Sequence, residues 1–278
     1  NDGVMLTPAS QNPWYVLATV AGEQEGRYFF EIDDELHVRN RRFWNGWMCQ
    51  GLEEDERGEL AAKLCLSEEG LAPLTAWEME IVKQRFESAF PERELQEVLP
   101  KPEALADFGR VHFPSIFALA QCHISGLADF RGACFAGDTS FRLTHFGKYT
   151  EFEDVHFTGD ADFQTTHFIG DAFFTGVRFG DVAFFKNARF SGCAFFSDAQ
   201  FLQTAHFANA QFHRLADYQN ALFNNYAVFQ ETVFNLEALF QLANFKKGAD
   251  FSNGCFKAKT VFGGVAFTGE VPQFFHRE

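Results

Sequence analysis

The sequence predicts an all-β solenoid, in which short strands stack coil upon coil, preceded by an N-terminal domain without that repeat. Three observations support this fold class. Phenylalanine recurs at alternating steps of five and six residues, small residues stand two positions before each phenylalanine, and neither pattern occurs in the first hundred residues. The chain has 278 residues, and its 38 Phe stand against only 4 Trp and 5 Tyr. An internal repeat, rather than general hydrophobicity, explains this excess.

The N-terminal domain is assigned to residues 1–102, where the composition differs from the rest of the chain. Its segments 14–20 and 27–32 are rich in aromatic and β-branched residues and are expected to form short strands. We expect an α/β or mostly helical cap that covers the open edge of the first coil, which would otherwise invite strand addition. An independent binding or sensory domain is the alternative.

Three helices are predicted in the same domain. Asp33 or Asp34 is a suitable N-cap for the first helix. Residues 53–66 form the second, whose acidic start suits the helix dipole. Thr75 opens the third, because a Glu follows it three residues later, as in a capping box. Pro91 interrupts that last helix.

The repeat occupies residues 103–270. From residue 108 to residue 267 the register has thirty positions, of which 27 are Phe, and the steps of five and six never slip. A small residue two positions earlier points to the same side as the phenylalanine in an extended chain, since side chains alternate with period two in a strand. A helix of 3.6 residues per turn could not keep this pattern on one face. Each unit is too short to bury its own phenylalanine, so the units must stack.

The repeat resembles a known family. The segments Ala-Asp-Phe-Arg-Gly-Ala-Cys-Phe (128–135), Ala-Asp-Phe-Gln-Thr-Thr-His-Phe (161–168) and Ala-Asp-Phe-Ser-Asn-Gly-Cys-Phe (249–256) resemble the pentapeptide-repeat family, in its Phe-centred branch with an extra residue in every second repeat. The resemblance implies a right-handed quadrilateral β-helix with four short faces in each coil. Four faces take about 22 residues, which gives about seven coils and a rod ~35 Å long. A flattened 11-residue coil is the alternative, but it leaves little room for two phenylalanines and two small residues.

The charges divide unevenly between the two parts of the chain. Residues 1–100 contain 9 Lys and Arg against 20 Asp and Glu, whereas residues 101–278 contain 14 against 18. Most of the net charge of −15 therefore lies in the N-terminal domain, and it argues against direct binding to nucleic acid or to an anionic membrane. No apolar run is long enough to span a bilayer. Six Cys without CxxC pairs indicate reduced thiols and a cytoplasmic protein.

Outward positions 22 residues apart should stack as ladders along the rod. One ladder contains His123, His145 and His167, whose imidazoles, ~4.8 Å apart, are candidate ligands of Zn²⁺ or Cu²⁺ at ~2.0–2.1 Å. The alternative is a solvent-facing repeat position that tolerates histidine, since the pattern identifies no fourth ligand. A second ladder stacks carboxylates, namely Asp107, Asp129 and Glu151. Stacked like charges cost stability unless a cation, a partner or solvent screening neutralises them.

Outward aromatic residues in the middle of the rod form a candidate interaction patch. They are Phe173, Phe184 and Phe195, of which Phe173 and Phe195 share a column. Apolar side chains on a surface otherwise polar often mark a protein-binding site. The alternative is that a neighbouring side chain or a second protomer covers them.

We find no sequence signal for catalysis or for a cofactor. The chain has no nucleophile elbow, phosphate-binding loop, HExxH motif or dinucleotide-binding fingerprint. The sequence therefore favours a non-catalytic scaffold that binds a protein partner along a regular surface. Metal binding by the histidine ladder is a further alternative.

The family resemblance implies another function, that of a bacterial DNA-mimicking protein that binds topoisomerase (gyrase) and confers quinolone resistance. Such relatives are dimers joined at their C-terminal ends, and the tail of residues 271–278, which leaves the register, is a candidate for that contact. Two features weaken this alternative. The repeat region carries little net charge, and its register never breaks to admit the loop insertions through which several gyrase-protecting relatives act.

Overall fold

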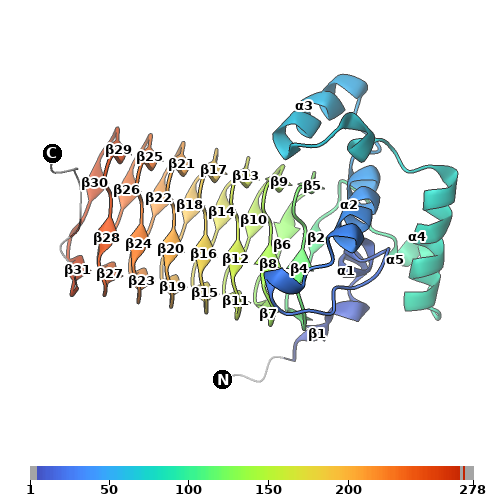
Figure 1. Cartoon of the computed structure of the whole chain (residues 1–278), viewed down its shortest axis with the longest axis horizontal. Helices are drawn as coiled ribbons and strands as arrows, with labels where there is room; N and C mark the ends of the chain where they lie inside the picture. Colours follow the sequence, from blue (N-terminus) through green and yellow to red (C-terminus); the bar gives the residue numbers. More distant parts are fainter. Residues whose placement is uncertain (1–4, 270–271, 273–278) are drawn as a thin grey trace.

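The computed structural model describes residues 5–269 and 272. A helical N-terminal region lies at one end of a straight rod of stacked coils (Figure 1). The predicted tail of residues 271–278 and its proposed dimer contact lie outside the described residues, apart from Pro272. The predicted solenoid is confirmed as four parallel sheets, which form the four sides of the rod.

We name the four sheets faces A, B, C and D. Face B has eight strands: β2 (Ala106–Asp107), β6 (Ala128–Asp129), β10 (Thr150–Glu151), β14 (Ala172–Phe173), β18 (Ala194–Phe195), β22 (Ala216–Asp217), β26 (Ala238–Leu239) and β30 (Thr260–Val261). Face A has nine: β1 (Thr7–Pro8), β3 (Val111–Phe113), β7 (Cys134–Phe135), β11 (His156–Phe157), β15 (Arg178–Phe179), β19 (Gln200–Phe201), β23 (Leu222–Phe223), β27 (Asn244–Phe245) and β31 (Ala266–Phe267).

Faces C and D have seven strands each. Face C contains β4 (Phe117–Ala118), β8 (Thr139–Ser140), β12 (Ala161–Asp162), β16 (Ala183–Phe184), β20 (Ala205–His206), β24 (Ala227–Val228) and β28 (Ala249–Asp250). Face D contains β5 (His123–Ile124), β9 (His145–Phe146), β13 (His167–Phe168), β17 (Arg189–Phe190), β21 (Gln211–Phe212), β25 (Val233–Phe234) and β29 (Cys255–Phe256). The chain passes through faces B, A, C and D in turn, so face B lies opposite face C, and face A opposite face D.

The strands pair with a spacing of 22 residues, as between Ala161 and Ala183, which confirms the 22-residue coil and rules out the 11-residue alternative. The inward phenylalanines are buried and stack in columns. Phe163 lies parallel to Phe185 with ring centroids 4.8 Å apart. It also meets Phe174 of the opposite face edge to face at 5.4 Å. Each buried ring contributes ~2–3 kcal/mol by removing apolar area from water, with a smaller gain from aromatic pairing.

The alternation of five and six residues reflects two kinds of corner. Where the chain leaves faces B and C after a short step, the residue two after the inward aromatic adopts positive φ, as at Thr165 (58°) and Asn187 (59°). Where it leaves faces A and D, the extra residue allows a wider corner that often contains glycine. A Cβ on Gly192 would lie 2.4 Å from the carbonyl carbon of Gly170 in the preceding coil. Successive coils therefore approach each other too closely at this corner for a side chain there.

The N-terminal region is helical. It contains α1 (Pro13–Ala18), α2 (Asp34–Met48), α3 (Glu54–Leu64), α4 (Ala76–Ala89) and α5 (Leu95–Val98), with 3₁₀ turns at Ala9–Gln11, Phe29–Glu31 and Glu68–Leu71. The three predicted helices are confirmed, with Asp33 capping α2 and Thr75 forming a capping box on α4. The predicted strands at 14–20 and 27–32 are wrong. Asn12 caps α1 with Pro13 in its first turn, an arrangement that favours a helix there.

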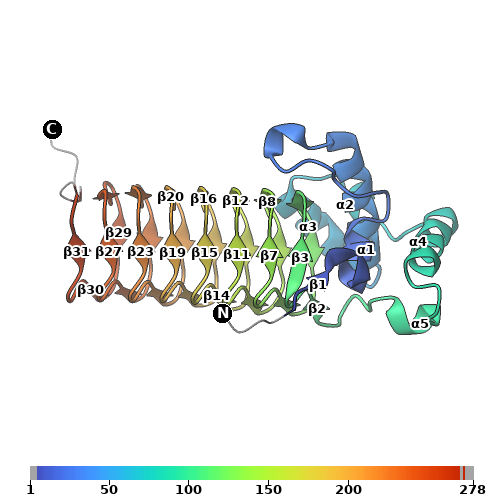
Figure 2. The ribbon, with the colours of Figure 1, turned by 90° about the horizontal axis from the view of Figure 1, so that it is seen from below.

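The N-terminal region caps the first coil, as expected. The ring centroids of Trp44 in α2 and Phe108 lie 6.4 Å apart, and those of Tyr15 in α1 and Phe113 lie 5.8 Å apart. The cap and the rod therefore share one hydrophobic core. Each face also receives a different backbone or side-chain partner at its open edge. On face A, β1 pairs with β3 (Figure 2), and on face B, Asn12 Nδ2 donates a hydrogen bond to Asp107 O. Beside face C, Gly26 O accepts a hydrogen bond from Ile116 N. On face D, Asn45 Oδ1 accepts one from His123 N.

Candidate functional site

The structure divides the three candidate phenylalanines between two faces. Phe173 and Phe195 are neighbours on β14 and β18 of face B, where their half-buried rings stack with centroids 5.0 Å apart and planes 9° from parallel. Phe184 lies on β16 of face C, on the opposite side of the rod, and stacks on His206 at 5.5 Å. The candidate patch on face B is therefore the pair Phe173 and Phe195, without Phe184.

The carboxylate ladder of face B contains its own cation. Arg131 pairs with Asp129 at 2.6 Å and with Glu151 at 3.0 Å. Burial raises the pKa of Glu151, while Arg131 opposes that shift. Sequence reasoning missed Arg131, although its position gave a signal. It follows Asp129 by two residues, which places both side chains on the outer side of the same coil.

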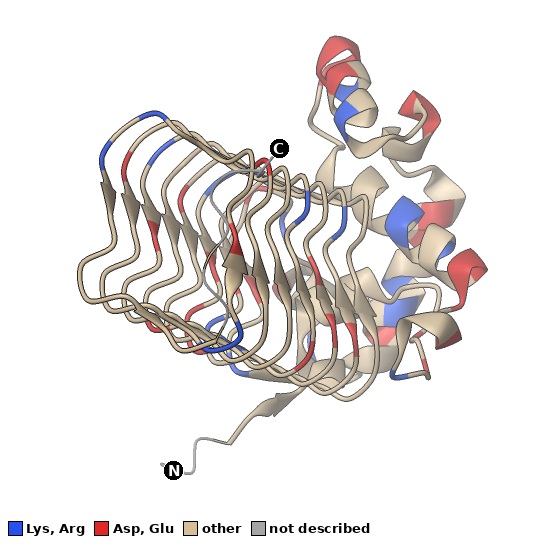
Figure 3. Cartoon of the chain, turned by 60° about the vertical axis from the view of Figure 1, so that its left-hand side comes forward, with Lys and Arg blue, Asp and Glu red and all other residues tan. Residues whose placement is uncertain are grey.

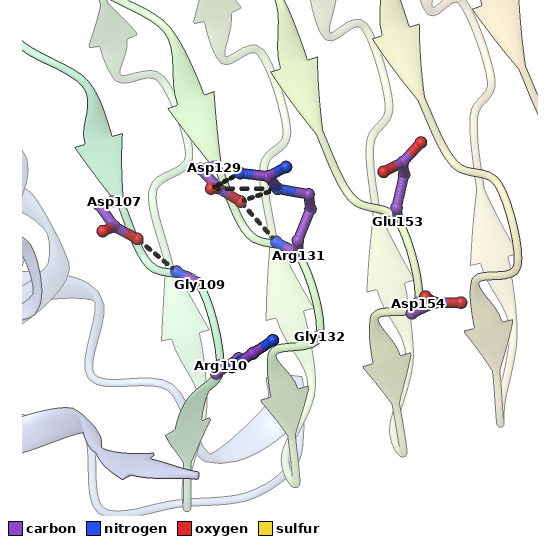
Figure 4. Close-up of a pocket in the computed structure, with 8 residues that line it drawn as sticks. All are labelled: Asp107, Gly109, Arg110, Asp129, Arg131, Gly132, Glu153 and Asp154. Carbon is purple, nitrogen blue, oxygen red and sulfur yellow. Dashed lines mark hydrogen bonds and ion pairs between the residues drawn. The ribbon is translucent and has the colours of Figure 1, made fainter. Parts of the chain in front are cut away.

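A shallow hollow of about 520 Å³ lies over the carboxylate ladder (Figure 4). It is lined by Asp107, Gly109, Arg110, Asp129, Arg131, Gly132, Glu153 and Asp154. The carboxylates of Glu153 and Asp154 make no ion pair with any described residue. This part of the hollow is therefore suited to receive a cationic group from outside the chain.

The histidine ladder is present on face D, but each of its rings already has one nitrogen in contact with a polar neighbour. The Nδ1 atoms of His123 and His145 lie 3.1 Å apart, within hydrogen-bonding distance, and His167 Nε2 lies 3.0 Å from Ser191 Oγ. Burial lowers the pKa of His123 and of His167 to about 4. Burial and the neighbouring histidines lower the pKa of His145 to about 3. All three imidazoles are thus neutral at neutral pH.

The arrangement of the three rings does not support the predicted metal centre. Within residues 5–269 and 272, no three His, Cys, Asp or Glu side chains are grouped so as to hold a metal ion. The contact between His167 and Ser191 has the spacing of a serine–histidine pair. No carboxylate among the described residues hydrogen-bonds the other ring nitrogen of His167, so the third member of a catalytic triad is missing there.

Comparison with known proteins identifies the repeat. Residues 119–167 and 174–217 match a family model described as pentapeptide repeats (9 copies). Neither the curated proteins nor the solved structures contain a match to this chain. In the described part of the chain, every helix is too short or too polar to cross a membrane.

Proposed function

Because the solenoid of this chain belongs to the pentapeptide-repeat family, we propose that the protein is a non-catalytic interaction scaffold whose face B binds a partner protein. A stacked solenoid offers a regular surface on which successive coils hold side chains at fixed positions, and the specific residues displayed there decide the function. The stacked pair of Phe173 and Phe195 carries this proposal. It is a half-buried aromatic pair on a face whose first coils carry charged side chains.

The surroundings of the aromatic pair indicate the chemistry of the partner. Glu151 pairs in register with Phe173, so the carboxylate ladder continues directly into the aromatic pair. Glu153 and Asp154 belong to the same coil as Glu151 and lack ion pairs among the described residues. A partner segment with a Lys or Arg next to apolar side chains would match this surface, because the charges would steer it and the aromatic rings would anchor it.

Paired variants test whether face B is the binding surface. Phe173→Ser/Phe195→Ser removes the aromatic pair, and Phe184→Ser removes one half-buried phenylalanine from the opposite face as a control. Proteins co-purifying from the native host are quantified by mass spectrometry. The amount of a co-purifying partner should fall at least about tenfold with the double variant, as expected when a binding hot spot is lost. The amount should stay unchanged with the control. Equal retention, or equal loss from both variants, would contradict the proposal.

The DNA-mimic alternative receives less support from the charge distribution. The carboxylates of face B lie mainly in the first coils, Arg131 neutralises two of them, and Phe173 and Phe195 follow. A mimic of duplex DNA needs negative charge at regular intervals along the rod. We therefore expect no change in gyrase supercoiling at micromolar concentrations of this protein, and inhibition in that assay would favour mimicry over the scaffold proposal.

A further inference from the structure

The charges of the rod are segregated by face. Five of the seven exposed cations of the second to fifth coils lie on face D and on the two corners beside it, namely Arg142, Lys148, Lys186, Arg189 and Arg214. The other two are Arg131 beside face B and Arg178 on face A. The same stretch of face D and its corners holds one carboxylate, that of Asp171. Blue segments recur along the upper rim of the rod in Figure 3, where face D lies in Figure 1. The low net charge of the rod thus conceals a basic side.

The cations of face D have no counter-ion within the described residues. The ion pairs of the described residues join Arg42 with Glu78, Arg85 with Glu23, and Arg131 with Asp129 and Glu151. None of these pairs lies on face D. The Asp171 side chain accepts a hydrogen bond from the backbone N–H of Cys193 at 2.8 Å. On face B, Arg131 pairs with two of the ladder carboxylates, whereas no cation of face D pairs with a carboxylate of the described residues. A complementary negative charge for face D must therefore come from another molecule.

The cap closes one end of this basic surface. Gln121 of the first coil donates from Nε2 to the carbonyl oxygen of Leu64 at 3.0 Å, which holds the end of α3 against the first coil. Figure 1 shows α3 projecting beyond face D at the cap end of the rod. Lys63 of α3 is close enough to contribute to the lowered pKa of His123, His145 and His167. Lys63 in the last turn of α3 therefore adds a cation at the cap end of face D, while three carboxylates of the same helix (Glu54, Asp55 and Glu56) lie in its first turn.

Apolar side chains form a shoulder along the same face. At the corner between faces D and B, Leu127 is 40% exposed, Tyr149 is 54% exposed and Ile169 is 39% exposed. One cation of the same corner lies beside them, since Lys148 precedes Tyr149 directly. Unspecific binding of a polyanion requires charge but no such apolar strip.

We propose that face D binds an acidic segment of a partner protein, in which carboxylates alternate with apolar residues, along the second to fifth coils. The carboxylates would meet Lys148 and Arg189, and the apolar side chains would lie on the shoulder of Leu127, Tyr149 and Ile169. A protein fits better than single-stranded nucleic acid, because Tyr149 is the one exposed aromatic ring of this shoulder and stacking platforms use several. This binding surface is separate from face B.

Peptide binding tests the proposal on the full-length protein. The probe is a fluorescein-labelled peptide of about six residues, ~20 Å when extended, which matches four coils spaced ~4.8 Å apart. In it Glu alternates with Leu and Ser. Its control peptide has Gln in place of every Glu. Fluorescence anisotropy should show that the Glu peptide binds and that binding weakens between about 50 mM and about 300 mM salt, as expected for exposed charges. Absence of binding, or equal binding of the Gln peptide, would overturn the proposal.

Matched charge reversals locate the surface. Lys148→Glu/Arg189→Glu changes face D, and Lys246→Glu/Lys247→Glu makes the same change in net charge at the exposed corner after β27. The Kd of the Glu peptide should rise at least about tenfold in the face D variant and stay within about twofold in the control, because charge pairing acts at short range in salt. Equal weakening in both variants would show that only net charge matters and would overturn the assignment.

Two further readouts separate a protein ligand from other anions. On peptide binding, the ring signals of His145 and His167 in ¹H–¹³C spectra should shift, while those of His156 on the opposite face A should not. Unchanged signals at His145 and His167 would place the peptide elsewhere.

A single-stranded DNA of about twenty nucleotides should bind more weakly than the Glu peptide, given the net charge of −15. Tighter binding of the DNA would assign face D to nucleic acid instead.

Discussion

At the residue scale, the inside of the rod is filled almost entirely by phenylalanine, because each ring must stack on the ring 22 residues later. Tyr218 is an exception with a measurable consequence. Its ring lies between Phe196 and Phe240 with centroids 4.9 and 5.0 Å away, like any phenylalanine of the column. Its hydroxyl, however, is fully buried and has no hydrogen-bond partner among the described residues.

We expect Tyr218→Phe to stabilise the protein. The substitution keeps the stacked ring and removes a buried polar group without a partner, which should raise the free energy of unfolding by ~1–3 kcal/mol. Equilibrium unfolding in guanidinium chloride measures the change. Phe196→Tyr, which introduces a second hydroxyl into the same column, is the opposite control and should lower stability. A neutral or destabilising Tyr218→Phe would mean that the hydroxyl has a partner such as an internal water.

The histidine ladder predicts how stability depends on pH. The pKa of His123 falls from 6.5 in its ordinary state to about 4 in the fold, because burial disfavours the charged imidazole. Between these values the unfolded chain binds more protons than the folded chain, so stability must fall as the pH falls below about 6.5. At pH 5 this difference amounts to about 2 kcal/mol for a fully buried histidine.

Thermal unfolding at pH 7 and pH 5 measures this dependence. His123→Gln should reduce the loss of Tm on acidification, because it removes one group that resists protonation in the fold. Gln211→Asn, which changes a half-buried residue of the same face that does not titrate, should leave the loss as it is in the unaltered protein. If both variants behave alike, the buried ladder is not the origin of the acid sensitivity.

At the element scale, the two kinds of corner explain most of the glycine pattern, which the sequence alone did not resolve.

The period of 11 residues could be predicted because every unit places a phenylalanine inside the rod at the same position in its own sequence. The spatial pairing of units was harder to see. Phe173 and Phe184 are half a coil apart, so they face opposite directions, whereas Phe173 and Phe195 are a full coil apart and stack. Cross-coil contacts such as Arg131 to Glu151 likewise depend on this pairing.

Glycine substitutions test the corner argument. A Cβ at Gly192 would lie 2.4 Å from the backbone of Gly170, so Gly192→Ala should push two coils apart and lower the free energy of unfolding by several kcal/mol. The control is Gly263→Ala, where the nearest heavy atom would be the Gln241 Cγ at 3.8 Å and ordinary contact is possible. Denaturant unfolding of the two variants compares them directly. Equal stabilities would show that the corner can relax.

At the scale of the whole molecule, the cap is where prediction from sequence was least complete. The three cap helices carried recognisable capping residues, whereas the strand predicted at 14–20 was overridden by the helix start at Asn12 and Pro13. The two residues of β1 are too few to produce a pattern, and only their pairing with Val111 and His112 identifies them as a strand. The edge contacts of the first coil are long-range, so no local signal could reveal them.

The pairing of β1 makes a final prediction about self-association. Removal of residues 1–8 deletes β1 and with it the hydrogen bond from Thr7 N to Arg110 O at 2.8 Å. The edge of β3 would then present unpaired backbone groups, which favour pairing with another chain. Size-exclusion chromatography with light scattering should show larger species that increase with protein concentration. Removal of residues 1–4 keeps β1 and should behave as the full chain does. Pro8 has no N–H with which to bind a further strand. With β1 in place, the edge of face A is therefore less able to pair with another chain than the bare edge of β3 would be.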